Sequence, residues 1–501
     1  MFCQWIKTAG MAAVISVGWV LPVSGADYDL VIQSGRVMDP ETGLDAVLNV
    51  GISGDRIAAL SAEPLMGAKV IDASGKVVAP GFIDTHLHGN SPAAYKLALR
   101  DGLTTAMDLE YGTLGSAVNE WYAKREGKTQ LNFGTASSHE LARSLVLDKF
   151  RAIDVSEGAL SRTAGNSWAL GVPNAEELEA ILKEIDVGLA AGAVAFGSTV
   201  GYMPGVSATE LYEAQKVASR WGRVSGVHTR HTPGTDTTVP NGIQEVMANA
   251  AALDAPLMVM HFNNPGWELV QELILGMRAN GKNVWGEIYP YAAGSTSLNA
   301  VFLQPEIWVE QLGNRYEETL FDPINHTFYT EDSYHEMMET DPGRGIVLYK
   351  MPAQQVPDWL RMEGITMGSD GMPIPDSYGW DTPYEALPNM HPRGAGARGR
   401  TLRIAREEGI PLMHVLAAMS YRPAKYLGDT GLKAMHERGR LQKNMIADIV
   451  IFDADTVTDN ATYEQGTLPT TGIDYVLVSG TVTVDQGRVL PDAAAGKPIR
   501  F

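Results

Sequence analysis

The sequence is poor in cysteine and in positive charge. Cys3 is the only cysteine among 501 residues, so a disulfide framework and a cysteine-based metal cluster are both excluded. Asp and Glu number 59 against 39 Lys and Arg, which gives a formal net charge of −20. A nucleic-acid partner is therefore not expected, because binding phosphates requires a basic face.

Between Lys7 and Asp27 the N-terminal segment has no charged side chain, and it ends in the small residues SGA. A cation, then an uncharged stretch, then small residues are typical of a secretory signal with its cleavage site. We expect residues 1–26 to be a cleaved signal peptide, whose removal also takes Cys3 away and leaves no cysteine nucleophile or ligand. The expected location is periplasmic or secreted, with no stable membrane association after cleavage. An uncleaved anchor is the alternative, because the stretch approaches the length of a membrane span.

The remaining composition, with 45% apolar and 20% charged residues, is that of a globular protein large enough for a barrel and a smaller domain. Short alternating runs broken by Gly and Pro occupy residues 27–75 and 430–501. This texture is typical of antiparallel strands. We expect the two chain ends to form one small β domain, a β-sandwich.

Residues 76–429 alternate strand patterns with helix patterns, as a (β/α)8 TIM-type barrel requires. Asn174 caps one expected helix, and Ser207 with Glu210 fits a capping box before another. A stretch at about 292–356 is too long for an ordinary loop, and we interpret it as an insertion over the barrel mouth. The expected strands are 77–88, 104–110, 131–140, 193–197, 224–230, 256–262, 283–291 and 365–370.

The first barrel strand lies in VVAPGFIDTHLHGN and ends in two histidines one residue apart. Side chains alternate faces along a strand, so His86 and His88 leave its end side by side. Two imidazoles on one face are half of a divalent metal site. Barrel enzymes keep their chemistry at the C-terminal ends of the strands, so further polar residues at those ends predict a metal site there. Those residues are Asp108, Glu110, His139, His228, His261 and Asp370.

These motifs resemble the amidohydrolase superfamily and, within it, the N-acyl-D-amino-acid deacylases (D-aminoacylases). PGFIDTHLH is similar to the family's strand-one metal motif, and GSDGMP followed by HPR is similar to its strand-eight motif and arginine loop. VGYMPG, YPYAAGSTSL and ADIVIFDADTV are also similar to deacylase segments, so the resemblance covers nearly the whole mature chain. In this family one or two divalent ions, usually zinc, activate a water that attacks an amide carbonyl. The resemblance implies a metal-dependent hydrolase of N-acyl-D-amino acids or related N-acyl compounds, with one or two Zn²⁺ ions.

Carried onto this sequence, the resemblance also implies roles for single residues. Asp370 would accept the proton of the attacking water and pass it to the leaving amine. His139 would donate to the carbonyl oxygen, or would be a structural histidine at a strand end. The implied metal-site residues are His86, His88, His228, His261 and Asp370, with Glu110 added as the strand-two ligand.

The substrate side of the implied site centres on Arg393, whose planar guanidinium can hold a carboxylate bidentately. A solvated surface arginine is the alternative interpretation of this residue. Expected further contacts to the substrate come from Tyr202, Tyr289, Ser295 and Asn263.

The sequence departs from the family pattern at three positions. Deacylases usually carry a cysteine ligand at the end of strand two, where this chain has Tyr111; Glu110, one residue earlier, is our substitute because a carboxylate is acceptable to zinc. The strand-four segment AGAVAFGS contains no lysine for a carbamylated bridge. The family's lysine two residues after the strand-six histidine is Asn263 here, which leaves Arg393 as the expected anchor of the substrate carboxylate.

Two alternatives follow from these departures. A dipeptidase or a cyclic-amide hydrolase of the same superfamily would use the same metal core with other loops. A non-catalytic scaffold would be expected to lose metal ligands, and this chain keeps at least five. The acyl group, the preferred side chain, the D or L selectivity and the number of metal ions stay open at this stage, and the sequence allows a homo-oligomer.

Overall fold

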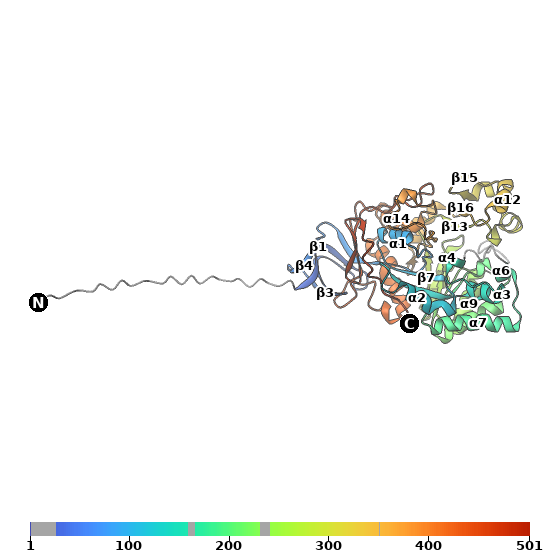
Figure 1. Cartoon of the computed structure of the whole chain (residues 1–501), viewed down its shortest axis with the longest axis horizontal. Coiled ribbons are helices and arrows are strands. Elements are labelled where there is room, and N and C mark those ends of the chain that lie inside the picture. The colour runs from blue at the N-terminus through green and yellow to red at the C-terminus, as the bar shows by residue number, and fades with distance from the viewer. Residues whose placement is uncertain (2–26, 159–165, 231–240, 350) are drawn as a thin grey trace.

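The structure is a computed structural model that describes residues 1, 27–158, 166–230, 241–349 and 351–501. The expected signal peptide lies outside these ranges apart from Met1. No helix among the described residues combines the length and the apolar character that crossing a membrane requires. A strand-rich part lies at the side where the described chain begins, and a larger part with many helices lies at the other side (Figure 1).

The larger part is built on eight parallel strands that pair in chain order. The ring closes just beyond the last strand, where Asp370 N donates to His86 O at 2.7 Å and His88 N donates to Gly371 O at 2.9 Å. The expected (β/α)8 barrel is therefore confirmed. Its strands are β6 (Phe82–Asp84), β7 (Leu103–Thr113), β8 (Asn132–Ser138), β9 (Ala195–Ser198), β10 (Val224–Val227), β11 (Leu257–Val259), β12 (Val284–Ile288) and β17 (Thr366–Met367).

Helices follow these strands and cover the outside of the barrel, as Figure 1 shows for α3, α7 and α9. Apart from those of the insertion, the α-helices that the structure describes between the barrel strands are α1 (Pro92–Arg100), α2 (Val118–Arg125), α3 (His139–Leu147), α4 (Val155–Gly158), α6 (Ser167–Leu170), α7 (Ala175–Ala190), α8 (Ala208–Arg220), α9 (Gly242–Leu253), α10 (Trp267–Ala279) and α13 (Val356–Arg361). After the last strand come α14 (Arg393–Glu407), α15 (Leu412–Leu416) and α16 (Arg422–Gly428).

The two helix starts expected from the sequence are present. The Asn174 side chain accepts hydrogen bonds from the first turn of α7, and Glu177 completes a capping box with it. The Ser207 side chain accepts from Glu210 N at the start of α8. The Glu210 carboxylate, however, turns into the interior and pairs with Arg143, so the second half of the expected capping box at Ser207 is not formed.

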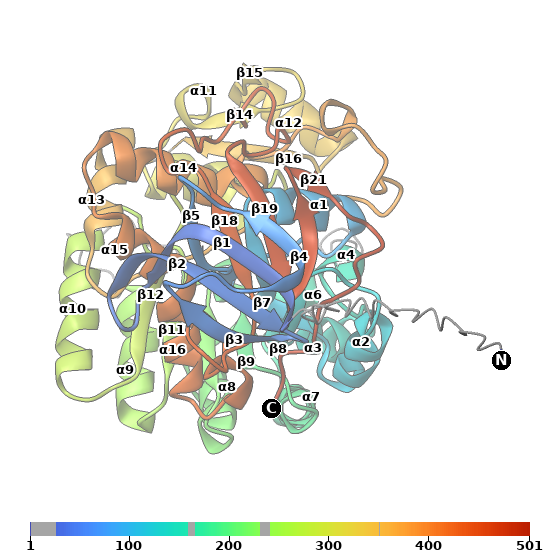
Figure 2. The ribbon, with the colours of Figure 1, turned by 90° about the vertical axis from the view of Figure 1, so that its left-hand side faces the viewer.

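The strand-rich part is one hydrogen-bonded sheet made from both ends of the chain. Figure 2 shows the blue N-terminal strands beside the red C-terminal strands, and β18 joins the two groups by pairing antiparallel with β5. Hydrogen bonds link all nine strands, so the expected sandwich is observed as a single continuous sheet. The strands are β1 (Tyr28–Asp39), β2 (Leu44–Ser53), β3 (Arg56–Ser61), β4 (Gly67–Asp72), β5 (Val77–Pro80), β18 (Ile449–Phe452), β19 (Ile473–Val478), β20 (Thr481–Asp485) and β21 (Arg488–Val489).

The first expected barrel strand, residues 77–88, is in fact divided between the two parts. Its first half is β5 in the small sheet, and its second half is β6 in the barrel. The change of sheet occurs at Gly81, where an added Cβ would lie 2.2 Å from the Thr104 side chain. Only glycine lets the backbone pass this close to β7.

The expected insertion forms a small unit with its own sheet and core. Its strands β13 and β16 pair antiparallel, and β14 adds to β16. Figure 1 shows this unit at one end of the barrel, around β13, β16 and α12. Its elements are β13 (Ala293–Ser297), η3 (Val301–Leu303), η4 (Glu306–Gln311), α11 (Tyr316–Thr319), β14 (Leu320–Asp322), β15 (Thr327–Phe328), α12 (Glu331–Thr340) and β16 (Gly345–Tyr349).

Candidate metal centre

A cavity of about 1030 Å³ opens at the C-terminal ends of the barrel strands. Its floor contains histidines and carboxylates from the strand ends, and part of its wall comes from the insertion. This is the face at which barrel enzymes place their chemistry. The expected site residues that line the cavity are His88, Glu110, Tyr202, His228, His261, Tyr289, Ser295, Asp370 and Arg393.

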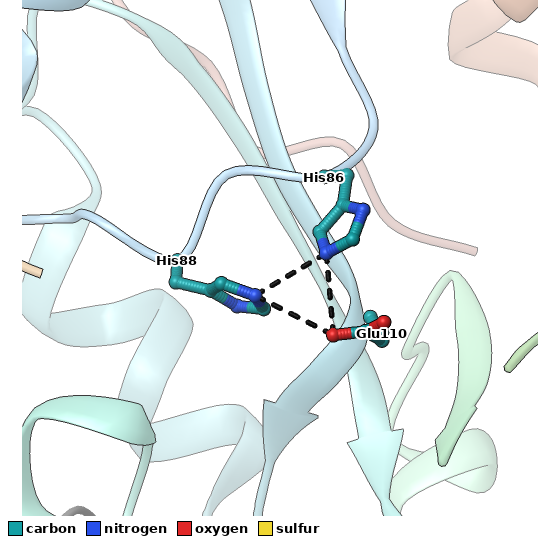
Figure 3. A group of neighbouring side chains, drawn as sticks. All are labelled: His86, His88 and Glu110. Carbon is teal, nitrogen blue, oxygen red and sulfur yellow. Dashed lines mark hydrogen bonds and ion pairs between the residues drawn. The ribbon is translucent and has the colours of Figure 1, made fainter. Parts of the chain in front are cut away.

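The first group of possible ligands is formed by His86, His88 and Glu110 (Figure 3). The two histidines come from the segment that follows β6, and Glu110 comes from β7. His86 Nε2 lies 3.2 Å from His88 Nε2 and 3.2 Å from Glu110 Oε2, and His88 Nε2 lies 3.5 Å from the same oxygen. Asp370 Oδ1 adds a fourth donor, at 3.5 Å from His86 Nε2 and 3.4 Å from His88 Nε2.

The second group uses the other oxygen of the same glutamate. Glu110 Oε1 lies 3.1 Å from His228 Nδ1 and 3.0 Å from His261 Nε2, and these two nitrogens are 2.9 Å apart. The Glu110 carboxylate therefore stands between two sets of imidazoles and presents one oxygen to each. The side chain that we expected as the strand-two ligand lies at the centre of the cluster.

The donor spacing fits a zinc ion. Four ligand atoms around tetrahedral zinc, at the usual bond length of about 2.0–2.1 Å, lie roughly 3.3–3.4 Å from one another. The His86–His88 spacing of 3.2 Å, and the spacings of 3.2–3.5 Å from these two nitrogens to the Glu110 and Asp370 oxygens, are close to this value. Imidazoles with carboxylates are also a donor set that zinc accepts. The spacings within the second group are 2.9–3.1 Å, which is shorter than this value, and these three donors could also hold a metal ion.

Two further carboxylates orient the first pair of histidines. Asp108 Oδ2 lies 3.0 Å from His88 Nδ1, and Glu287 Oε2 lies 3.0 Å from His86 Nδ1. A carboxylate on Nδ1 fixes the tautomer that leaves Nε2 free to bind a metal. Glu287 Oε2 also accepts a hydrogen bond from His261 N at 3.1 Å, so it holds residues of both groups.

The electrostatics of the cluster favour a bound cation. Burial lowers the pKa of the His86 and His88 imidazoles, but the surrounding carboxylates outweigh burial and raise each pKa well above its usual value. Burial raises the pKa of Glu110, but His86 and His228 outweigh it and hold that pKa well below its usual range. Burial lowers the pKa of His228 to about 4, which keeps this imidazole neutral near pH 7 and available as a ligand.

Asp370 joins the metal cluster to the expected substrate anchor. Its Oδ2 forms an ion pair with Arg393 Nη1 at 2.8 Å. Burial raises the pKa of Asp370, but Arg393 and His86 outweigh burial and hold the pKa far below its usual value. Asp370 has a φ of 51°, and His261 a φ of 29°. Non-glycine residues rarely adopt such values, which cluster at functional sites.

A buried network fixes the backbone that carries His86 and Asp370. Asp84 Oδ1 accepts from His86 N at 2.9 Å and from Ser369 N at 3.2 Å. Asp84 Oδ2 pairs with Arg398 Nη1 at 2.8 Å, and both side chains are completely buried. The first and last barrel strands are therefore held at a fixed spacing just below the cluster.

The expected substrate contacts divide into those in the cavity and those outside it. Arg393 lies under the insertion, with its guanidinium 4.9 Å from the Tyr289 ring centre and Nη2 3.4 Å from Ser295 O. It is buried, so the alternative of a solvated surface arginine is wrong. The Tyr202 ring packs 4.7 Å from the His228 ring, and its hydroxyl lies 3.1 Å from Thr296 Oγ1.

Two expected site residues are placed elsewhere. His139 is completely buried and does not line the cavity; its Nδ1 lies 2.9 Å from Ser198 Oγ and its Nε2 3.0 Å from Glu210 Oε1. With both nitrogens engaged by protein groups, His139 is the structural histidine of the two alternatives, and the catalytic interpretation is wrong. Asn263 is also completely buried outside the cavity lining, and its amide donates to Tyr289 O at 3.2 Å. It positions the chain at Tyr289 and has no surface for a substrate.

The sequence interpretation missed Glu287. A usable signal was present: Glu287 is the only charged residue within β12, and a charge inside a strand of a buried parallel sheet needs a specific partner.

Comparison with known proteins agrees with this geometry. No family model matches the chain. The chain is 30% identical to an N-acyl-D-glutamate deacylase of Alcaligenes xylosoxydans xylosoxydans, over 94% of this chain and 98% of the relative. It is 26% identical to a D-aminoacylase of the same organism, over 93% of this chain and 98% of the relative.

Solved structures of related proteins have the same fold. A D-aminoacylase structure said to define a novel subset of amidohydrolases has a TM-score of 0.73 at 25% identity, covering 95% of this chain and all of the other. The N-acyl-D-glutamate deacylase from Bordetella bronchiseptica, complexed with zinc and a phosphonate inhibitor, has a TM-score of 0.72 at 24% identity, with the same coverage. With near-complete coverage on both sides, the chain belongs to the N-acyl-D-amino-acid deacylases, a family of metal-dependent amidohydrolases.

Proposed function

We propose that this protein is a zinc-dependent hydrolase that removes the acyl group from N-acyl-D-amino acids. The observation that carries the proposal is the position of Arg393, a buried cation in direct contact with Asp370 at the edge of the metal cluster. A free α-carboxylate on the substrate matches this cation. Relatives that match over nearly the full length are an N-acyl-D-glutamate deacylase, a D-aminoacylase and an N-acyl-D-aspartate deacylase.

The proposed ligands follow from the two groups of donors. His86, His88 and Asp370 would hold one ion, His228 and His261 a second, and Glu110 would contribute one oxygen to each. Bound zinc supplies Lewis acidity, which lowers the pKa of a water molecule towards roughly 7 and polarises a carbonyl oxygen.

The protein groups then move the proton. The low pKa of Asp370 keeps it ionised, so it can accept a proton from the attacking water. The protonated acid can then donate to the amine that leaves, which must depart as a neutral group. Arg393 would hold the carboxylate of the leaving amino acid beside Asp370. Tyr202, next to His228, would donate a hydrogen bond from its hydroxyl to the carbonyl oxygen.

A panel of substrates tests the proposal. The purified protein, reconstituted with zinc, would be assayed on the N-acetyl derivatives of D- and L-amino acids, on dipeptides and on cyclic amides such as hydantoins. Release of the free D-amino acid is the expected result. Activity only on dipeptides or only on cyclic amides would overturn the proposal in favour of another amidohydrolase reaction, and no activity at all would favour a non-catalytic scaffold.

We also propose that the mature protein is exported to the periplasm or secreted, after removal of residues 1–26. The uncharged stretch after Lys7 and the small residues before Asp27 support this. N-terminal sequencing of the protein from the producing cells tests it. A mature start near Asp27 is expected, and an intact N-terminus in the membrane fraction would overturn it.

A further inference from the structure

We propose that the insertion forms a second subsite of the cavity, which binds an extended apolar acyl group on the substrate nitrogen. The inference rests on the proposed function and deepens it, because it adds the class of acyl group to the hydrolysis of N-acyl-D-amino acids. A fatty-acyl chain is the chemical class that fits.

A row of aromatic rings leads from the metal cluster into the insertion. The His228 ring centre lies 4.7 Å from that of Tyr202, which lies 5.5 Å from that of Phe302. The Phe302 ring centre lies 6.1 Å from that of Trp308. All four side chains border the same cavity, so an apolar surface begins at a metal-ligand candidate and continues into the insertion.

Two leucines widen this apolar surface. Leu312 and Leu348 also border the cavity; Leu348 belongs to the insertion core that contains Phe302 and Trp308, and the partly buried Leu312 packs against this core. The polar residues Asn299 and Asn314 of the insertion also border the cavity, but none of these side chains carries charge. This wall therefore favours an apolar group over an ionised one.

The cavity is larger than the acetylated substrate requires. Its volume of about 1030 Å³ is at the upper end of the range of roughly 300–1,000 Å³ that encloses drug-sized ligands. An N-acetyl amino acid has only about a dozen non-hydrogen atoms and would leave the insertion side of this cavity to water.

The orientation of the bound substrate would place its acyl group on the insertion side of the cavity. Arg393 follows β17, whereas Tyr202 follows β9, which is the strand opposite β17 in the eight-stranded ring. The acyl group and the amino acid lie on opposite sides of the scissile bond, so a carboxylate on Arg393 directs the acyl group towards Tyr202. Strand β13 runs between these two side chains. Ser295 O lies 3.4 Å from Arg393 Nη2, and the Tyr202 hydroxyl donates a hydrogen bond to Thr296 Oγ1 at 3.1 Å.

Acyl-chain length is the direct test. One D-amino acid would be assayed as its acetyl, hexanoyl and dodecanoyl derivatives. One buried methylene is worth roughly fourfold in affinity, so kcat/KM should rise at least about tenfold from acetyl to dodecanoyl. Equal values, or a preference for acetyl, would overturn the subsite while leaving the deacylase function intact.

Substitutions locate the subsite. Phe302→Ala should lower kcat/KM on the dodecanoyl substrate by about tenfold or more and change it on the acetyl substrate by less than about threefold. Phe302→Leu should restore much of the loss. The matched control is Phe328→Ala, an exposed phenylalanine of the same insertion that does not border the cavity. Equal effects of Phe302→Ala on both substrates would contradict the assignment.

A binding measurement separates this inference from the proposed reaction. The zinc-loaded protein would be titrated calorimetrically with acetate, hexanoate and dodecanoate, which contain no amide bond. Affinity that rises with chain length, accompanied by a negative heat-capacity change and lost in Leu312→Glu, would support the subsite even if no N-acyl-D-amino acid were hydrolysed. Affinity independent of chain length would overturn it.

Discussion

Arg393 Nη1 lies 2.8 Å from Asp370 Oδ2, and both side chains are buried beside the metal cluster. This ion pair links the group that would bind the substrate carboxylate to the group that would move the proton. One arginine therefore has two effects, on substrate binding and on the pKa of the general base, and each effect can be measured separately.

The effect on binding is tested by Arg393→Lys. Lysine keeps the charge but cannot hold a carboxylate with two parallel hydrogen bonds. We expect kcat/KM on carboxylate-bearing substrates to fall by about tenfold or more, with a much smaller change on substrates whose carboxylate is amidated. Equal losses on the two kinds of substrate would remove Arg393 from the carboxylate site.

The effect on the base is tested by the pH profile of Arg393→Gln on an amidated substrate. The Arg393 charge holds the pKa of Asp370 down, and burial raises it. Without the guanidinium this pKa must rise, so less of Asp370 is ionised at mildly acidic pH. The acidic limb of kcat/KM should move to higher pH in Arg393→Gln and move little in Arg393→Lys. Superimposable limbs in the wild type and Arg393→Gln would show that Asp370 is not the base.

The role of Asp370 itself is tested by Asp370→Asn. Asparagine tolerates the left-handed backbone conformation found at Asp370, where φ is 51°, so the fold should be retained. The amide cannot accept the proton, and turnover should fall by about 10²-fold or more. Zinc content, measured in the same preparation, should be retained at least in part. A modest loss of turnover would indicate another base.

Most residues of this site could be predicted because they stand at the ends of expected strands, and the carboxyl ends of parallel strands meet at one face of the barrel. His86, His88, Glu110, His228 and His261 were all identified in this way. Position at a strand end does not fix which way a side chain points once the strand has finished. Asn263 shows this: β11 ends at Val259 and the backbone of His261 has a φ of 29°, so the alternation that would place Asn263 beside His261 no longer applies.

The other differences between the expected and the observed structure involve residues whose partners lie far away in the sequence. His139 is held by Glu210 and Ser198, and Glu287 is held by His86. The change of sheet at Gly81 depends on a close contact with Thr104. Local patterns contain no information on such pairs, and only the packed barrel brings them together.

The buried pair below the cluster is tested by Asp84→Ala. The substitution leaves the Arg398 guanidinium buried without its carboxylate and removes the acceptor for His86 N. Breaking a buried pair in this way typically costs about 3–5 kcal/mol, which urea unfolding would measure. Zinc affinity should fall as well, because His86 loses its support. Asp84→Asn, which keeps acceptor capacity, should be less damaging, and a cost below about 1 kcal/mol for Asp84→Ala would contradict this role.

The bridging position of Glu110 is tested by metal analysis of Glu110→Gln. The amide has only one oxygen and no charge, so it cannot serve both donor groups. We expect at least one equivalent of zinc to be lost relative to the wild type, with a large fall in activity. Tyr111→Phe is the matched control at the next residue, which belongs to neither donor group, and it should keep its zinc. Unchanged zinc content in Glu110→Gln would contradict the shared carboxylate.

The most direct measurement is zinc-dependent, stereospecific hydrolysis by the purified protein, with metal content determined on the same samples. The account predicts that the zinc-loaded protein releases the free D-amino acid from its N-acyl derivative and not the L-amino acid from the enantiomer. It also predicts that chelation abolishes this activity, that zinc restores it, and that His228→Ala and His261→Ala lose both bound zinc and nearly all activity. Full activity of either variant after chelation, or no hydrolysis of any N-acyl-D-amino acid by the zinc-loaded wild type, would contradict it.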